Sequence, residues 1–119
     1  MAIVVHVLIA LIALLHVYFV LLETVLFNTR GRRVFGLSAE KAEIMAPAMS
    51  NQGCYNGFLV AALVLGLLHP DPVVARAFAV FGLVCVAVAG VWGAVTVKKT
   101  ILYIQALPAV LALALLILG

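Results

Sequence analysis

One acidic residue, Glu23, lies near the end of a long apolar run, and it is the side chain best suited to proton chemistry. His16 precedes it by seven residues, so both side chains fall on nearly the same face of a helix. A carboxyl and an imidazole arranged in this way can hold and exchange a proton. Each also has a structural interpretation, in which Glu23 reaches the headgroups or pairs with Arg30 and His16 hydrogen-bonds a neighbouring helix.

A carboxamide-rich segment follows further along the chain, with the sequence Asn51-Gln52-Gly53-Cys54-Tyr55-Asn56-Gly57. Carboxamides donate and accept hydrogen bonds without carrying charge, which suits them to a polar neutral or zwitterionic group. We expect Asn56, the deeper residue, to belong to a site. Asn51 and Gln52 also fit the headgroup layer, and the two glycines fit close packing between helices.

Three further residues, Trp92, Tyr103 and Gln105, lie near the ends of later apolar runs. Trp92 and Tyr103 fit an interfacial aromatic belt as well as a cavity wall. The complete set of candidate ligand-binding residues is Glu23, His16, Asn51, Gln52, Tyr55, Asn56, Trp92, Tyr103 and Gln105. Within this set, Glu23 and His16 are the candidates for acid–base catalysis. No two histidines have metal-ligand spacing on one face, so we expect no metal and no cofactor.

The composition indicates that these residues belong to a membrane protein. Hydrophobic residues make up 68% of the 119 positions and charged residues only 9%, far from the balance of a water-soluble domain. The apolar residues form four continuous runs, at about 2–27, 48–68, 73–97 and 100–118. Each run can cross the hydrocarbon core, and continuous rather than alternating runs indicate helices. The predicted fold is all-α, with one four-span membrane domain over residues 1–119.

The connections between the runs set their relative directions. The short connections at 69–72 and 98–99 require antiparallel neighbours, which predicts a four-helix bundle. The longer connection, at 28–47, is predicted to be a loop. Within it, Ser38 can cap a short helix, and Pro47 can either start or kink the second span. Residues 38–47 are therefore either a separate interfacial helix or continuous with that span.

The distribution of basic residues predicts the orientation. Six of the seven Lys and Arg residues lie in the first and third connections, and only Arg76 lies on the other side. This asymmetry predicts that the 28–47 loop is cytoplasmic and that both termini face outward. The basic residues are divided between loops and accompany no aromatic groove, so the expected partner is a lipid bilayer and not nucleic acid.

In this orientation, the polar residues of all four runs fall in the cytoplasmic half of the membrane. The outer half carries few, with His6 and Arg76 as the main exceptions. Polar residues that only anchored helix ends would occur equally at both ends. We therefore expect these side chains to face the bundle centre and to line a cytoplasm-facing polar cavity around Glu23.

Four segments of the chain together resemble a known family. They are His16-Val17-Tyr18 followed by Glu23, residues 51–58 (NQGCYNGF), residues 89–96 (AGVWGAVT) and residues 105–109 (QALPA). This pattern resembles the family catalogued as domain of unknown function 1304, which consists of small bacterial four-span membrane proteins. The resemblance covers nearly the whole chain and implies the fold and a multi-pass location in the bacterial inner membrane. It implies no activity.

Three functions stay open at this point. The first is binding or transport of a small polar or amphipathic ligand, with Glu23 changing protonation as the ligand enters. A through-path would require a homo-oligomer, because four spans make a thin bundle. The second is a membrane-embedded enzyme that acts on a lipid or quinone-like substrate, with Glu23 and His16 as acid and base. The third is a structural or regulatory subunit whose polar residues only tie helices together. Binding or transport is the leading hypothesis.

Overall fold

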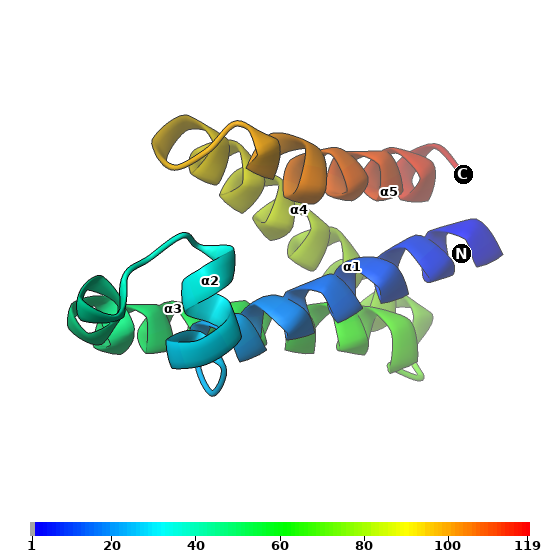
Figure 1. Cartoon of the computed structure of the whole chain (residues 1–119). Helices are drawn as coiled ribbons and strands as arrows, with labels where there is room; N and C mark the ends of the chain where they lie inside the picture. The colour runs from blue at the N-terminus through cyan, green and yellow to red at the C-terminus, as the bar shows by residue number, and fades with distance from the viewer. Residues whose placement is uncertain (1) are drawn as a thin grey trace. The chain divides into compact units, whose positions relative to one another are not determined.

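The computed structural model of the chain describes residues 2–119, which are almost entirely helical (Figure 1). The elements in chain order are α1 (Ile3–Glu23), the π-helix η1 (Phe27–Gly31), α2 (Arg32–Val34), α3 (Ala39–Leu68), α4 (Pro72–Thr96), the π-helix η2 (Leu102–Ala106) and α5 (Leu107–Leu118). No strand occurs within residues 2–119, which confirms the all-α prediction. Contacts divide the chain into two compact units, one of residues 2–13 and 59–119 and the other of residues 14–58.

Three helices are long and apolar enough to cross a membrane. They are α1, α3 and α4, with 21, 30 and 25 residues. At 1.5 Å per residue, even α1 extends about 31 Å, which matches a hydrocarbon core of about 30 Å. The fourth predicted run forms the shorter helix Leu102–Leu118, which begins as a π-helix and continues as an α-helix. Length and composition therefore support three of the four predicted spans, and the four-span bundle stays a prediction.

Helix α3 decides between the two alternatives for residues 38–47. It begins at Ala39 and continues through Pro47, so these residues are continuous with the second run and form no separate helix. Ser38 caps α3, because its hydroxyl accepts a hydrogen bond from the Lys41 amide at 3.2 Å. Pro47 lies about two turns into the helix, where it removes one backbone hydrogen bond without ending the element.

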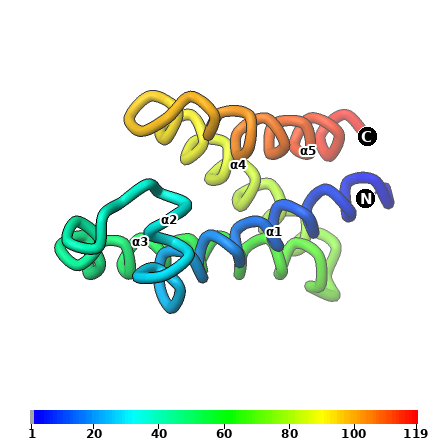
Figure 2. The backbone as a smooth tube through the Cα atoms, in the orientation of Figure 1, coloured from blue at the N-terminus to red at the C-terminus, as the bar shows by residue number. Residues whose placement is uncertain are grey.

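The connection from α1 to α3 is partly helical, and Figure 2 shows the chain turning back through it. The sequence predicts a first helix to residue 27 and a loop at 28–47, whereas α1 ends at Glu23 and η1 and α2 follow. A Cβ on Gly31 would lie 2.0 Å from the Leu22 carbonyl oxygen, so only glycine allows η1 to fold against the end of α1. Gly36, with a φ of 67°, then ends α2 in the left-handed region.

In the unit of residues 2–13 and 59–119, α4 runs antiparallel to η2 and α5 and packs along them (Figures 1 and 2). The buried apolar core of this unit consists of Val5, Ile9, Ile12, Ala13, Leu63, Ala79, Leu83, Val86, Ala109, Ala112 and Leu116. Small residues bring the backbones close, since a Cβ on Gly90 would lie 2.5 Å from the Ala106 nitrogen. Gly90 therefore serves helix packing.

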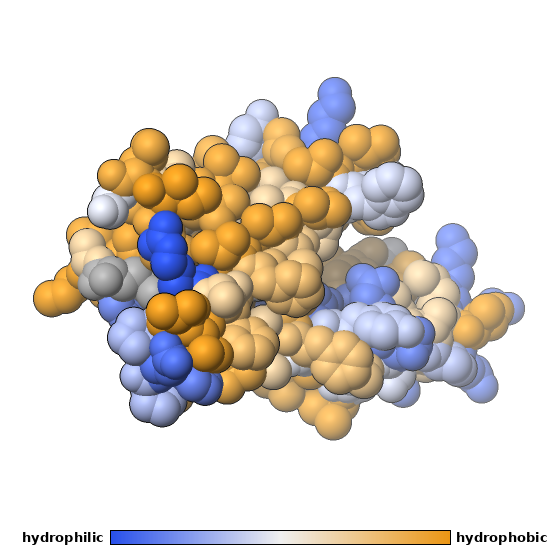
Figure 3. Space-filling model, turned by 180° about the vertical axis from the view of Figure 1, so that it is seen from behind, coloured by the Kyte–Doolittle hydropathy of each residue, from blue (hydrophilic) through white to orange (hydrophobic). Residues whose placement is uncertain are grey.

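Hydrophobic side chains form most of the surface seen in Figure 3. Large apolar residues are widely exposed on the helices, including Ile3 at 80% and Val95 at 80% of their maximum area. Extended apolar surface of this kind is rare on water-soluble monomers and is typical of contact with lipid. The surface thus agrees with the composition and with the three apolar helices.

Candidate functional site

The candidate site is built around Glu23, the last residue of α1. Its side chain is only 4% exposed. Gln52 donates from Nε2 to the Glu23 Oε2 atom at 2.8 Å, and Asn56 donates from Nδ2 to Oε1. The two amides lie four residues apart, and so on one face of α3. Each carboxyl oxygen therefore receives one amide, and all three residues belong to the unit of residues 14–58.

A glycine allows α3 to approach α1 at this point. A Cβ on Gly53 would lie 2.6 Å from the Thr24 methyl carbon and 3.2 Å from the Glu23 Cβ. The Thr24 hydroxyl donates to the Val20 carbonyl oxygen at 2.6 Å, which holds that methyl group in place. A Cβ on Gly57, by contrast, would meet nothing within 4 Å. Of the two glycines expected to serve close packing, only Gly53 does so among the described residues.

The cation nearest in sequence, Arg30, has another partner. Its Nε donates to the Tyr18 hydroxyl at 2.6 Å, and its guanidinium carbon lies 5.6 Å from the centre of the Tyr18 ring. The predicted alternative, in which Glu23 pairs with Arg30, is therefore not what the structure contains. Sequence reasoning missed the Tyr18–Arg30 contact because η1 brings together residues whose spacing of twelve matches no helical repeat.

His16 lies within α1 and is completely buried, at 0% exposure. Its ring meets the Phe19 ring edge-on, with 5.2 Å between the ring centres. Burial against an aromatic ring gives His16 a fixed packing position. Its predicted role as the acid–base partner of Glu23 stays a prediction.

The other candidate residues lie elsewhere on the helices. Asn51 and Tyr55 are exposed, and the Tyr55 ring meets Phe58 with 5.9 Å between centres. In the other unit, Trp92 on α4 and Tyr103 on η2 are 71% and 66% exposed, and Gln105 on η2 is half-buried. Such exposure suits an aromatic belt. The structure thus brings together Glu23, Gln52 and Asn56, and a ligand-binding role for any of the predicted residues stays a prediction.

The electrostatics of this cluster are unusual for an apolar helix. A carboxylate has about four acceptor positions, and the two amides fill two of them. Amides are neutral, so they solvate the carboxylate without cancelling its charge. An uncompensated charge within a membrane is costly, and it is relieved by a proton or by a cationic group.

Comparison with known protein families identifies one family that covers most of the chain. The family model described as protein of unknown function (DUF1304) matches residues 10–117, so the chain belongs to this family. The match includes Glu23, Gln52 and Asn56, and the description assigns no activity. The chain has no significant match among curated proteins or among solved structures.

Proposed function

We propose that this member of the DUF1304 family is a membrane protein that binds a small polar or cationic amphipathic ligand at the carboxyl group of Glu23, and that it moves the ligand in exchange for a proton. The observation that carries the proposal is the burial of Glu23 at 4% exposure with two neutral amides as its hydrogen-bond donors. A carboxyl group held in this way retains acceptor capacity for a ligand.

The proposal includes an arrangement in the bacterial inner membrane with four spans and both termini outward. The helix Leu102–Leu118 has 17 residues and extends about 26 Å, near the lower limit for a span. Lys98 and Lys99 precede it, and the other basic connection lies between the first two spans. The positive-inside rule then assigns the Glu23 end of α1 to the cytoplasmic side.

The proposed cycle uses the chemistry of one carboxyl group. A protonated Glu23 is neutral and keeps its amide partners. A cationic ligand displaces the proton and restores the carboxylate, with Gln52 and Asn56 still donating to it. Because the proton and the ligand compete for the same oxygens, ligand affinity falls as the pH is lowered. Passage across the whole membrane requires more than one copy of the chain, as the thin bundle predicts.

Equilibrium binding of tetraphenylphosphonium, an amphipathic cation, tests the proposal on the detergent-solubilised protein. Glu23→Gln should lose the binding, because it removes the negative charge of the carboxylate. The substitution keeps the size of the side chain and one acceptor oxygen. Glu43→Gln is the matched control, because it removes the same charge at an exposed position of α3. Equal binding by the wild type and Glu23→Gln would contradict the proposal, as would binding that strengthens at lower pH.

A second candidate function is favoured by one specific observation. Glu23 joins α1 to α3 through two hydrogen bonds at the place where Gly53 brings the helices together. These residues would then serve only to hold two helices in a structural or regulatory subunit. In that case Glu23→Gln lowers the thermal stability, and the wild-type protein does not bind tetraphenylphosphonium at any pH.

A further inference from the structure

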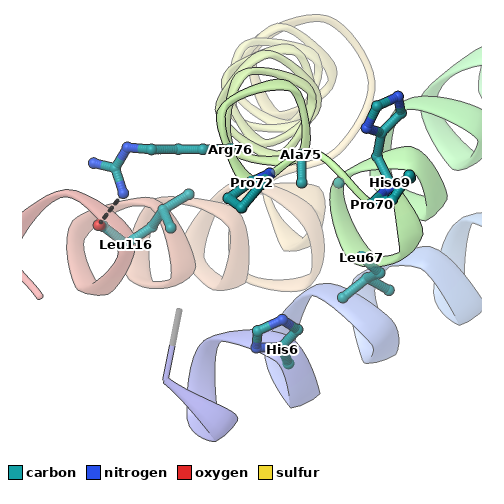
Figure 4. A pocket seen from close by; sticks show the side chains of 9 residues that line it. His6, Leu67, His69, Pro70, Pro72, Ala75, Arg76 and Leu116 are labelled. Atoms are coloured by element: carbon teal, nitrogen blue, oxygen red, sulfur yellow. Dashed lines mark hydrogen bonds between the residues drawn. The ribbon is translucent and has the colours of Figure 1, made fainter.

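Arg76 occupies an isolated position, far in sequence from the other basic residues. It is the only Lys or Arg between residues 42 and 97, and it lies about one turn after the start of α4 at Pro72. A guanidinium in an apolar helix is costly unless it has anionic or polar partners. One partner is the Leu116 carbonyl oxygen on α5, to which Arg76 Nη1 donates at 3.1 Å (Figure 4). A guanidinium has five N–H donors, so others stay available.

No carboxylate within residues 44–119 neutralises this charge through a described contact. Asp71 is the only acid in that range, and its Oδ1 accepts the Val73 amide at 2.9 Å as the N-cap of α4. His6 and His69 line a hollow that Arg76 shares, in which the Arg76 side chain extends toward α5 and His69 lies at the end of α3 (Figure 4). This end of the unit thus favours an anionic group.

An apolar groove of about 580 Å³ begins at the same arginine. Its lining residues recur at helical spacing along one face of α4: Val73, Arg76, Ala77, Val80, Phe81 and Val84. From Arg76 to Val84 the face extends about 12 Å, somewhat less than half of a hydrocarbon core of about 30 Å, and Val73 lies on the other side of Arg76. The groove therefore accommodates much of one acyl chain in one leaflet, with a single cation near one end.

We propose that this groove, together with Arg76, binds one phospholipid with an anionic headgroup. The guanidinium donates to the phosphate oxygens, for which its planar fork is well suited. The acyl chain lies along the apolar face from Ala77 to Val84. The charge at one end and the purely apolar lining beyond it together select a lipid over a soluble anion. This site is separate from Glu23 and does not depend on the function proposed there.

Lipid retention measured by native mass spectrometry tests the proposal. The full-length protein in mild detergent is mixed with equal amounts of phosphatidylglycerol and phosphatidylcholine. We expect the wild type to retain phosphatidylglycerol preferentially. Arg76→Gln should reduce its retention about tenfold, the effect of losing one charge-assisted hydrogen-bonding partner, while Arg76→Lys should keep much of it. Lys99→Gln is the control that removes one positive charge at a distant position in the chain.

A second variant tests the groove without touching the guanidinium. Ala77→Trp fills the apolar face with an indole and should reduce phosphatidylglycerol retention while the Arg76–Leu116 hydrogen bond stays in place. Inorganic phosphate, added in excess, should not displace the lipid. Equal retention by Arg76→Gln and the wild type would overturn the proposal. So would unchanged retention in Ala77→Trp, or displacement by phosphate, because either result describes a headgroup site without an acyl groove.

Discussion

Glu23 differs from the three other acidic residues of the chain in its surroundings. Glu40, Glu43 and Asp71 are exposed, whereas Glu23 is 4% exposed. Its position near the end of an apolar run made it recognisable from the sequence, and the amides were among the residues expected to line a cavity around it. Which amides would reach it depended on the rotation of α1 and α3 about their axes. Asn51 and Asn56 are five residues apart and so point about 140° apart around α3, and a different rotation of this helix would have turned Asn51 toward Glu23 in place of Asn56. Sequence spacing alone does not fix that rotation.

The hydrogen bond from Asn56 predicts a stability difference between two similar residues. Asn56→Leu should destabilise the protein by about 1 kcal/mol, because it removes a half-buried donor to Glu23. Asn51→Leu is the matched control on the same helix, and as an exposed residue it should change the stability much less. Thermal unfolding in detergent measures both. Equal effects of the two substitutions would mean that the contact with Glu23 contributes nothing.

At the scale of elements, the sequence predicted where helices occur better than where they end. Apolar runs locate α1, α3 and α4 because the cost of burying unpaired backbone groups in lipid forces such runs into helices. The end of α1 at Glu23 was missed because the next residues, Thr24 to Phe27, include no glycine or proline to signal a break. The break arises instead from the packing of η1 through Gly31, which is a tertiary effect.

The contact between α1 and α3 predicts unequal effects of the same substitution at two glycines. Gly53→Ala should destabilise the protein by about 1–3 kcal/mol, because the new methyl group would overlap the Thr24 methyl at 2.6 Å and force the helices apart. Gly57→Ala meets nothing within 4 Å, so it should be neutral or mildly stabilising through its higher helix propensity. Chemical or thermal unfolding of the two variants side by side checks this. Comparable losses at both positions would contradict the close approach at Gly53.

At the scale of the whole molecule, composition was the most informative property. It excluded a soluble domain, and the helical structure and its apolar surface agree with that exclusion. The sequence also predicts a polar cavity lined by residues of all four runs. Of these residues, Glu23, Gln52 and Asn56 form a hydrogen-bonded cluster within residues 14–58. Trp92 and Tyr103 are exposed residues of the other unit, so their place in the wall of this cavity stays a prediction.

The proposed orientation predicts which connections are accessible from each side of the membrane. In a background with Cys54→Ser and Cys85→Ser, single cysteines are introduced as Asn28→Cys, Pro70→Cys and Thr100→Cys, all at exposed positions. A membrane-impermeant maleimide should label Pro70→Cys in intact cells, and the other two only after the membrane is opened. Labelling of Asn28→Cys and Pro70→Cys from the same side would refute the proposed topology.

Labelling with dicyclohexylcarbodiimide tests whether Glu23 exchanges a proton for a cationic ligand. This apolar reagent modifies protonated carboxyl groups within membranes, and mass spectrometry of peptides locates the modified residue. If Glu23 exchanges a proton for the ligand, modification at Glu23 declines when tetraphenylphosphonium is added, with no such protection of the exposed Glu40 and Glu43. Absence of modification at Glu23, or modification that tetraphenylphosphonium leaves unchanged, would rule out this exchange.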